Sequence, residues 1–356
     1  MEWIQELLVG ILENPIAFTA VKIAVAFGIV LSAVPMLVWM ERKSAARFQR
    51  REGPNRVGPF GLLQSFADAI KLIFKEDYFP RNTDKAVFLL APILTFMPGV
   101  ISFGLVSITA TRSGKLLGVT DINMGLLVML AISSLAGYGI AFAGWSSNNQ
   151  YSLLGGIRSS AQLISYEIVM GLAVVALLLK TGSLSLGEIV QQQTGVFFGF
   201  IPKWNIFMWP PCFFLFLLAA FAETSRAPFD NPEAEQELVG GYHTEYTGLR
   251  YAWFMFGEYA GLWTMCSIMV ALFMGGWHFP GMESVIQGEW TFALVGFGVF
   301  VAKVLVLIFF FMWMRWTVPR MRWDQLMNLS WTRLIPIALG NLVVLALAME
   351  YGGLFR

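Results

Sequence analysis

Long apolar stretches alternate with short polar segments along nearly the whole chain. About 20 apolar residues are enough to cross a bilayer as a helix. By this measure the sequence predicts eight membrane spans, near residues 15–40, 86–110, 122–144, 159–179, 206–222, 249–275, 291–316 and 334–351. The pattern is therefore typical of an all-α integral membrane protein, with residues 1–356 as a single transmembrane domain.

Two segments outside the spans have amphipathic patterns. In residues 61–75, within the connection 41–85, the polar residues Gln64, Asp68, Lys71 and Lys75 recur at helical spacing among apolar ones. This predicts a helix lying on the membrane surface. It could serve as a lipid anchor or help to admit a lipidic ligand, and amphipathicity alone does not separate the two. Residues 1–14 carry acids rather than a basic leader, and they predict a second short interfacial helix instead of a cleaved signal.

Composition supports the membrane assignment, and the distribution of charge predicts the orientation of the chain in the membrane. The chain is 57% hydrophobic and 13% charged, whereas soluble domains carry roughly 25% charged residues. Ten lysines and arginines lie from Arg42 to Lys85, and the odd-numbered connections together carry 17 against 5 on the opposite face. Basic connections stay on the cytoplasmic side, so both termini are expected on the periplasmic or intermembrane side. A net charge of +1 gives no indication of nucleic-acid binding.

Cysteine usage argues against a metal centre in this chain. Cys212 and Cys266 are its two cysteines, and each lies in an apolar run. Iron–sulfur and structural zinc sites need clustered Cys or His ligands. We therefore expect no metal ligands here.

Charged residues inside the predicted spans are the first candidates for function. Glu167, Glu258 and Lys303 lie within spans, and Glu41 and Glu223 close two of them. A charge at the bilayer centre costs about 2.5–3.5 kcal/mol on insertion scales and usually marks a functional path. Poor hydration favours the neutral form of a carboxyl group, which lets it hold and release a proton near neutral pH. These residues predict a proton relay; the alternative is a buried structural pair, such as a glutamate with Lys303.

An acid-rich segment, ETSRAPFDNPEAEQELVGGYHTEY, runs from residue 223 to 246 and forms most of the connection 223–248. Acids are favoured at a helix N-terminus, which would explain Asp230 and Glu233. That preference does not explain the others, and Arg226 can neutralise one or two at most. The acids of this segment are therefore more than solubility requires in a short loop, and its glutamates are Glu223, Glu233, Glu235, Glu237 and Glu245.

Four long motifs resemble one family in order along the chain. RAPFDNPEAEQELVGGYHTEY resembles the signature of the quinone-cavity membrane subunit of proton-pumping NADH:quinone oxidoreductase, respiratory complex I, which is called the H subunit in bacteria and subunit 1 in mitochondria. WMERKSAARFQRREGPNRVGPFGLLQSFADAIKLIFKED resembles its first loop, GWSSNNQYSLLGGIRSSAQLISYE its third connection, and PRMRWDQLM its last cytoplasmic segment. One departure is Ser225, where the family often has Asn.

The resemblance implies a function for the charged residues. It implies a quinone tunnel between spans one and six, the amphipathic helix and the loops, lined or braced by Arg42, Arg47, Asp68, Arg226, Phe229 and Asp230. It also implies an acidic loop beside the tunnel, formed by Glu233, Glu235, Glu237 and Glu245. A chain of carboxylates would continue inward toward pumping subunits, made of Glu41, Glu167, Glu223 and Glu258. Quinone would be the substrate, and the iron–sulfur clusters and flavin would belong to partner subunits. The implied partners are the soluble arm and the other membrane subunits. We expect the chain in a bacterial plasma membrane, with an organellar inner membrane as the alternative.

Two other functions fit the residues. A stand-alone proton-coupled secondary transporter would also carry acids and a lysine inside its spans, and membrane-bound hydrogenases contain a related subunit. A purely structural anchor for a redox enzyme is a further alternative. Native gels of solubilised membranes separate these functions, because a transporter runs as a small oligomer and a respiratory subunit runs in a very large assembly.

Overall fold

A computed structural model describes residues 15–112, 116, 118–119, 122–197, 201–231, 235–282 and 286–352. The interfacial helix expected in residues 1–14 lies outside them, as does Glu233. Side chains of Glu235 and Gln236 are likewise not described.

Long helices make up most of the described chain, as the apolar pattern predicts. They are α2 (Pro15–Phe48), α4 (Lys85–Gly104), α5 (Gly125–Ser133), α6 (Leu135–Ser146), α7 (Gln150–Thr181), α10 (Pro210–Glu223), α12 (Gly248–Phe273), α14 (Glu289–Thr317) and α16 (Ile335–Gly352). Local signals set several of their ends. Asp84 caps α4 by accepting a hydrogen bond from the Ala86 amide, and Asn149 caps α7 in the same way.

Short elements connect these helices. They are η1 (Pro59–Gly61), α3 (Gln64–Phe74), α8 (Leu186–Gln192), β1 (Val196–Phe197), β2 (Ile201–Pro202), α9 (Asn205–Met208), α11 (Glu235–Leu238), η2 (Gly241–His243), α15 (Trp323–Asn328) and the π-helical η3 (Leu329–Leu334). The strands β1 and β2 form a two-stranded antiparallel pair. α3 lies where the sequence predicts the amphipathic helix.

Seven of the eight predicted spans lie in helices long and apolar enough to cross a membrane. The fifth is α10, an apolar helix of 14 residues. At 1.5 Å per residue it is about 21 Å long, less than the hydrocarbon core of about 30 Å. Pro210 and Pro211 begin α10 and separate it from α9, because proline cannot continue a helix toward its N-terminal side. The prediction of eight apolar segments is correct, but one of them is shorter than a full span.

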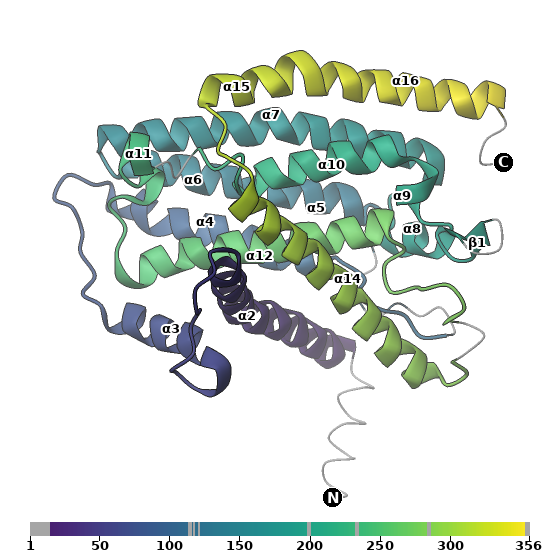
Figure 1. Cartoon of the computed structure of the whole chain (residues 1–356), viewed down its shortest axis with the longest axis horizontal. Coiled ribbons are helices and arrows are strands. Elements are labelled where there is room, and N and C mark those ends of the chain that lie inside the picture. The colour runs from purple at the N-terminus through teal and green to yellow at the C-terminus, as the bar shows by residue number, and fades with distance from the viewer. Residues whose placement is uncertain are drawn as a thin grey trace, which may run out of the picture.

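The helices form one bundle in which most axes run side by side (Figure 1). α14 crosses the others obliquely, and α16 lies along the outside of α7, which it contacts. α12 is central, since it packs against α2, α4, α10 and α14. Close approach of α6 and α7 depends on small residues: a Cβ atom on Gly144 would lie 3.0 Å from the Cα of Gly156.

The two ends of the bundle differ in what they carry (Figure 1). α3 and α11 lie at one end, which we call the α3 end. α8, α9 and β1 lie at the other, the α8 end. α3 contacts both α2 and α12, and the Ser65 hydroxyl of α3 donates a 2.8 Å hydrogen bond to the carbonyl of Pro35 in α2. Most of the candidate functional residues lie toward the α3 end.

Candidate functional site

A buried cluster of charges surrounds Glu41 near the end of α2. Arg226 Nη1 donates to both carboxylate oxygens of Glu41, at 3.0 and 3.3 Å. The Tyr259 hydroxyl donates to Oε2 at 2.9 Å, and Arg315 Nη1 donates to Oε1. Glu41 and Arg226 are 6% and 4% exposed. Four separate elements thus supply one ionic cluster, which we call the Glu41 cluster.

The turn that follows α10 positions Arg226. Ser225 has a φ of 47°, in the left-handed region. The Arg226 amide donates to the Phe221 carbonyl, and the Ser225 amide donates to Ala222. These bonds are those of a Schellman motif, in which glycine or asparagine usually takes the left-handed position. The side-chain amide of Gln162 in α7 holds the same turn by donating to two backbone carbonyls, those of Ala222 and Phe229.

Arg226 stays charged in this setting. Burial opposes its charged form, but the neighbouring Glu41 carboxylate outweighs burial, so the pKa of Arg226 lies above its ordinary value. The guanidinium also lies over the Tyr259 ring, 4.6 Å from the centroid. Its Nε and Nη2 atoms are buried and have no hydrogen-bond partner among the described residues.

Two cavities adjoin the Glu41 cluster and share a wall. The first, about 570 Å³, is lined by Glu41, Arg315, Glu258 and His243, among others; we call it the charged cavity. The second, about 330 Å³, lies between α2, α3 and α12 and is mainly apolar; we call it the apolar cavity. Both are lined by Val38, Arg42, Tyr251, Met255 and Tyr259.

Arg42 and Asp68 mark the junction of the two cavities. They form an ion pair between α2 and α3, and Gln64 also donates to the Asp68 carboxylate at 3.2 Å. Both residues line the apolar cavity, and Arg42 also lines the charged one. The apolar cavity under α3 is thus a direct neighbour of the charged cavity beside the Glu41 cluster.

Glu258 connects the charged cavity with the interior of the bundle. It lines that cavity and also a smaller inner cavity of about 70 Å³. The inner cavity is lined by Glu223, Thr95, Thr224 and Tyr242 as well. The Tyr242 hydroxyl donates to Glu258 Oε1 at 3.2 Å. This volume is sufficient for water, which needs roughly 10–15 Å³ and polar partners.

Glu167 extends the series of carboxylates beyond the inner cavity. It lies on α7 and is close enough to Glu223 to interact with it electrostatically. Glu41, Glu258, Glu223 and Glu167 thus run from the α3 end toward the centre of the bundle. Glu233 and Glu235 cannot be placed in this series, because their side chains lie outside the described part of the chain.

The acid-rich connection is held to the start of α7. Glu237 Oε2 is 2.6 Å from Arg158 Nη1, and Glu245 Oε1 accepts from Asn149 Nδ2 at 2.6 Å. Polar groups of another element therefore face these acids. Arg226, the arginine of the connection itself, bonds to Glu41 of α2 instead.

Asp230 and Phe229 lie behind the cavities rather than on their walls. Asp230 accepts from Arg320 Nη2 at 2.7 Å. Burial raises the pKa of Asp230 above its ordinary value, although Arg320 opposes the effect. The Phe229 ring is 2% exposed and packs 5.3 Å from that of Tyr166. Both residues brace the turn that holds Arg226.

Arg47 and Lys303 lie apart from this site. Arg47 lines a different cavity, on another face of α2. Lys303 is near the α8 end, where its ammonium donates to the carbonyls of Met274, Gly276 and His278 at 2.7, 2.9 and 2.6 Å. The suggested pairing of Lys303 with a glutamate is not found within the described ranges; its ammonium binds backbone carbonyls.

Comparison with known proteins identifies the family. A family model described as NADH dehydrogenase matches residues 21–346. An NADH-quinone oxidoreductase H subunit of Geobacter metallireducens is 47% identical over 333 residues, covering 92% of this chain and 95% of the relative. The corresponding protein of Cytophaga hutchinsonii is 43% identical over 338 residues, covering 94% and 96%. The chain belongs to the family of NADH-quinone oxidoreductase H subunits.

As a member of the H-subunit family, the chain is a multi-pass membrane component of a multi-subunit oxidoreductase. Reasoning from its sequence missed three residues of the site: Tyr242, Tyr259 and Arg315. Tyr259 directly follows an acid inside a span, and Arg315 is a cation near the end of one. Both positions could have been noticed in the sequence. Their common partner could not, because Glu41 lies 218 residues from Tyr259 and 274 residues from Arg315.

Proposed function

We propose that this H-family protein forms most of a quinone passage and couples quinone reduction to proton translocation. The apolar cavity under α3 would admit the isoprenoid tail, and the headgroup would travel through the charged cavity. Electrons would come from an iron–sulfur cluster of a soluble partner, which would also hold the headgroup at the point of reduction. Flavin and clusters belong to partner subunits in this proposal.

One observation carries the coupling: Glu258 lines both the charged cavity and the inner cavity that contains Glu223. Reduction of a quinone to a quinol takes up two electrons and two protons. The electrons would bring negative charge close to the Glu41 cluster before the protons neutralise it, and this transient charge would alter the field at Glu258. A proton can then move between Glu258 and Glu223 through water in the inner cavity, and onward to Glu167.

The acid-rich connection and the orientation complete the proposal. Glu233, Glu235, Glu237 and Glu245 would form the outer part of the proton path, next to the quinone passage. The α3 end, with its basic residues, would face the cytoplasm and the soluble arm, in the plasma membrane of a bacterium. Both termini would then lie on the periplasmic side. We leave Lys303 out of the path, because three carbonyls hold its ammonium.

Replacement of Glu258 or Glu223 by glutamine tests this path. Each variant is expected to lower the number of protons pumped per NADH in sealed membrane vesicles. Electron transfer from NADH to an artificial acceptor should not change, because it does not use this protein. Glu188→Gln is the matched control, since Glu188 is an exposed acid at the α8 end. Normal pumping in both variants would remove the two residues from the path.

A further inference from the structure

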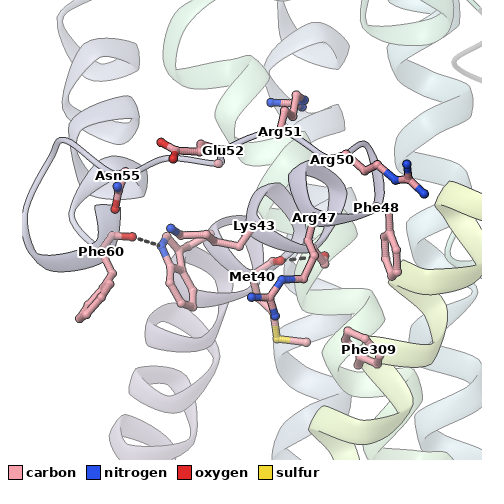
Figure 2. Close-up of a pocket in the computed structure, with 13 residues that line it drawn as sticks. Met40, Lys43, Arg47, Phe48, Arg50, Arg51, Glu52, Asn55, Phe60 and Phe309 are labelled. Atoms are coloured by element: carbon pink, nitrogen blue, oxygen red, sulfur yellow. Dashed lines mark hydrogen bonds between the residues drawn. The ribbon is translucent and has the colours of Figure 1, made fainter.

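A further cavity of the α3 end lies on a different face of α2 from the charged cavity. It measures about 840 Å³. Its wall combines the end of α2, the loop that follows, and Phe309 of α14 (Figure 2). We call it the basic cavity. Arg51 is the one lining residue that it shares with the charged cavity, so the quinone passage does not account for it.

Cations dominate the rim of the basic cavity. Lys43, Arg47, Arg50 and Arg51 line it together with one acid, Glu52, which leaves a formal charge of +3. In the described part of the chain none of these four cations forms an ion pair. Arg51 bonds instead to the neutral side chain of Gln49. The rim therefore presents uncompensated positive charge, which favours an anionic ligand.

The opposite side of the basic cavity is apolar and continues along a helix that can span the membrane. Met40, Phe48 and Phe309 lie on this side, and the rings of Phe48 and Phe309 are 6.5 Å apart. Phe309 is 44% exposed. It belongs to an exposed face of α14 formed at helical spacing by Ala302, Val306, Phe309 and Trp313. This face would meet lipid chains in the bilayer.

We propose that the basic cavity binds the phosphodiester headgroup of an anionic phospholipid, whose acyl chains lie along the exposed face of α14. Basic pockets between membrane helices at the cytoplasmic surface recognise such headgroups. A zwitterionic lipid is disfavoured, because its own ammonium would be repelled by the rim. An acidic segment of a soluble subunit would match the charge of the rim, but it would leave the exposed apolar face of α14 uncovered.

Photo-crosslinking in membranes that contain the whole complex tests the proposal. The probes are phosphatidylglycerol and phosphatidylcholine, each with a diazirine in the same acyl position. Phosphatidylglycerol is expected to label the segment 302–313 at least about tenfold more than phosphatidylcholine does. The double variant Lys43→Gln/Arg50→Gln should reduce this labelling about tenfold, since each cation near the surface contributes several-fold to binding. Arg56→Gln, an exposed cation of the same loop that does not line the cavity, should leave it unchanged.

Three results would overturn the lipid assignment. Equal labelling by the two lipids would mean that the cavity has no headgroup preference, and this comparison needs only the unaltered complex. Displacement of the label by an excess of inorganic phosphate would indicate a site for a free anion. A photo-reactive residue in place of Phe60, at the rim and 73% exposed, is expected to capture lipid; capture of a neighbouring protein would show a protein occupant. Blue-native gels confirm assembly of each variant.

Discussion

Glu41 holds the charged cluster together, because it is the carboxylate that two arginines and a tyrosine share. Its buried charge is tolerable only while those donors stay in place. The buried charge of Arg226 likewise depends on Glu41, because Glu41 is the acid with which it forms an ion pair. The cluster is thus a fixed arrangement of charges, because both arginines and the tyrosine bond to the same carboxylate.

Glu41→Gln is expected to destabilise the protein strongly, because it leaves the Arg226 guanidinium buried without a counter-charge. Breaking a buried pair in this way costs about 3–5 kcal/mol. Arg315→Gln should cost less, since Arg315 is partly exposed and its loss leaves Glu41 paired with Arg226. The measurement is the temperature at which the purified complex loses this protein. Equal shifts for the two variants would contradict the central position of Glu41.

At the scale of elements, the connection between α10 and α12 is attached to α7 at Arg158 and to its cap at Asn149. Partly exposed ion pairs such as Arg158–Glu237 contribute about 0–1 kcal/mol to stability. Their value here lies in the placement of the acid-rich connection next to the charged cavity. Loss of this ion pair alone therefore costs the fold little.

Glu237→Gln is expected to slow quinone reduction several-fold without a measurable change in thermal stability, because it releases one attachment of the connection. Arg158→Gln should give the same result, as it removes the other half of the pair. NADH oxidation with a quinone and with an artificial acceptor is compared in membranes, and only the quinone rate should fall. Glu76→Gln provides an exposed acid at the same end as a control. Unchanged quinone rates in both pair variants would contradict a role for this attachment.

Lys303 lies near the α8 end of the bundle. Its ammonium donates hydrogen bonds to three carbonyls just beyond the end of α12. Lys303→Met is expected to destabilise the protein by about 2 kcal/mol or more, since unsatisfied buried acceptors cost about 1–3 kcal/mol each. Thermal midpoints of the complex are compared with those of Lys203→Met, an exposed lysine at the same end. The assembled variant should pump normally; a reduced pumping ratio would return Lys303 to the proton path.

On the scale of the whole molecule, α3 closes one side of the apolar cavity, whose other walls are α2 and α12. The charged cavity lies next to it and is lined by Glu41 and Arg315. Such an order suits a molecule with an apolar tail and a polar headgroup. It also explains why an amphipathic helix that packs onto two membrane helices is more than an anchor in the proposed function.

Ala69→Phe is expected to narrow the apolar cavity, because Ala69 lines it from α3. The KM for a long-tailed quinone should rise several-fold, while that for a short-tailed analogue should change little. Ala67→Phe is the matched control, since Ala67 lies on the same helix but does not line the cavity. Steady-state rates with the two quinones measure the effect. Equal KM changes for both substrates would show that the tail does not pass under α3.

Much of the fold could be predicted from the sequence, because apolar length and period identify membrane helices directly. The short α10 was harder to predict, since Pro210 and Pro211 lie within an apolar stretch of ordinary length. Charged residues inside the spans identified Glu258 and Glu167 as candidates. The free-energy cost of a charged residue inside a membrane span depends on that residue and its position alone, so one sequence is enough to identify such residues.

Side-chain partners could not be predicted in the same way. Arg226 bonds to Glu41, 185 residues away, rather than to acids close by in the sequence. Arg47 lies five residues after Arg42, and the turn of α2 places the two on different cavities. Lys303 reaches carbonyls whose orientation depends on the turns at Gly275 and Gly276, which both have positive φ. Such contacts follow from how helices cross, and local pattern does not determine that.

α14 is fastened at two places, by Arg315 to Glu41 and by Lys303 to the turn beyond α12. The twelve residues from one to the other correspond to about 18 Å of helix. A helix of this length is stiff, so the two fastenings move together or one of them breaks. α14 therefore couples the Glu41 cluster mechanically to the turn beyond α12. A tilt imposed on α14 at Arg315 would be transmitted to the turn that Lys303 holds. This coupling would not need a proton path between the two places.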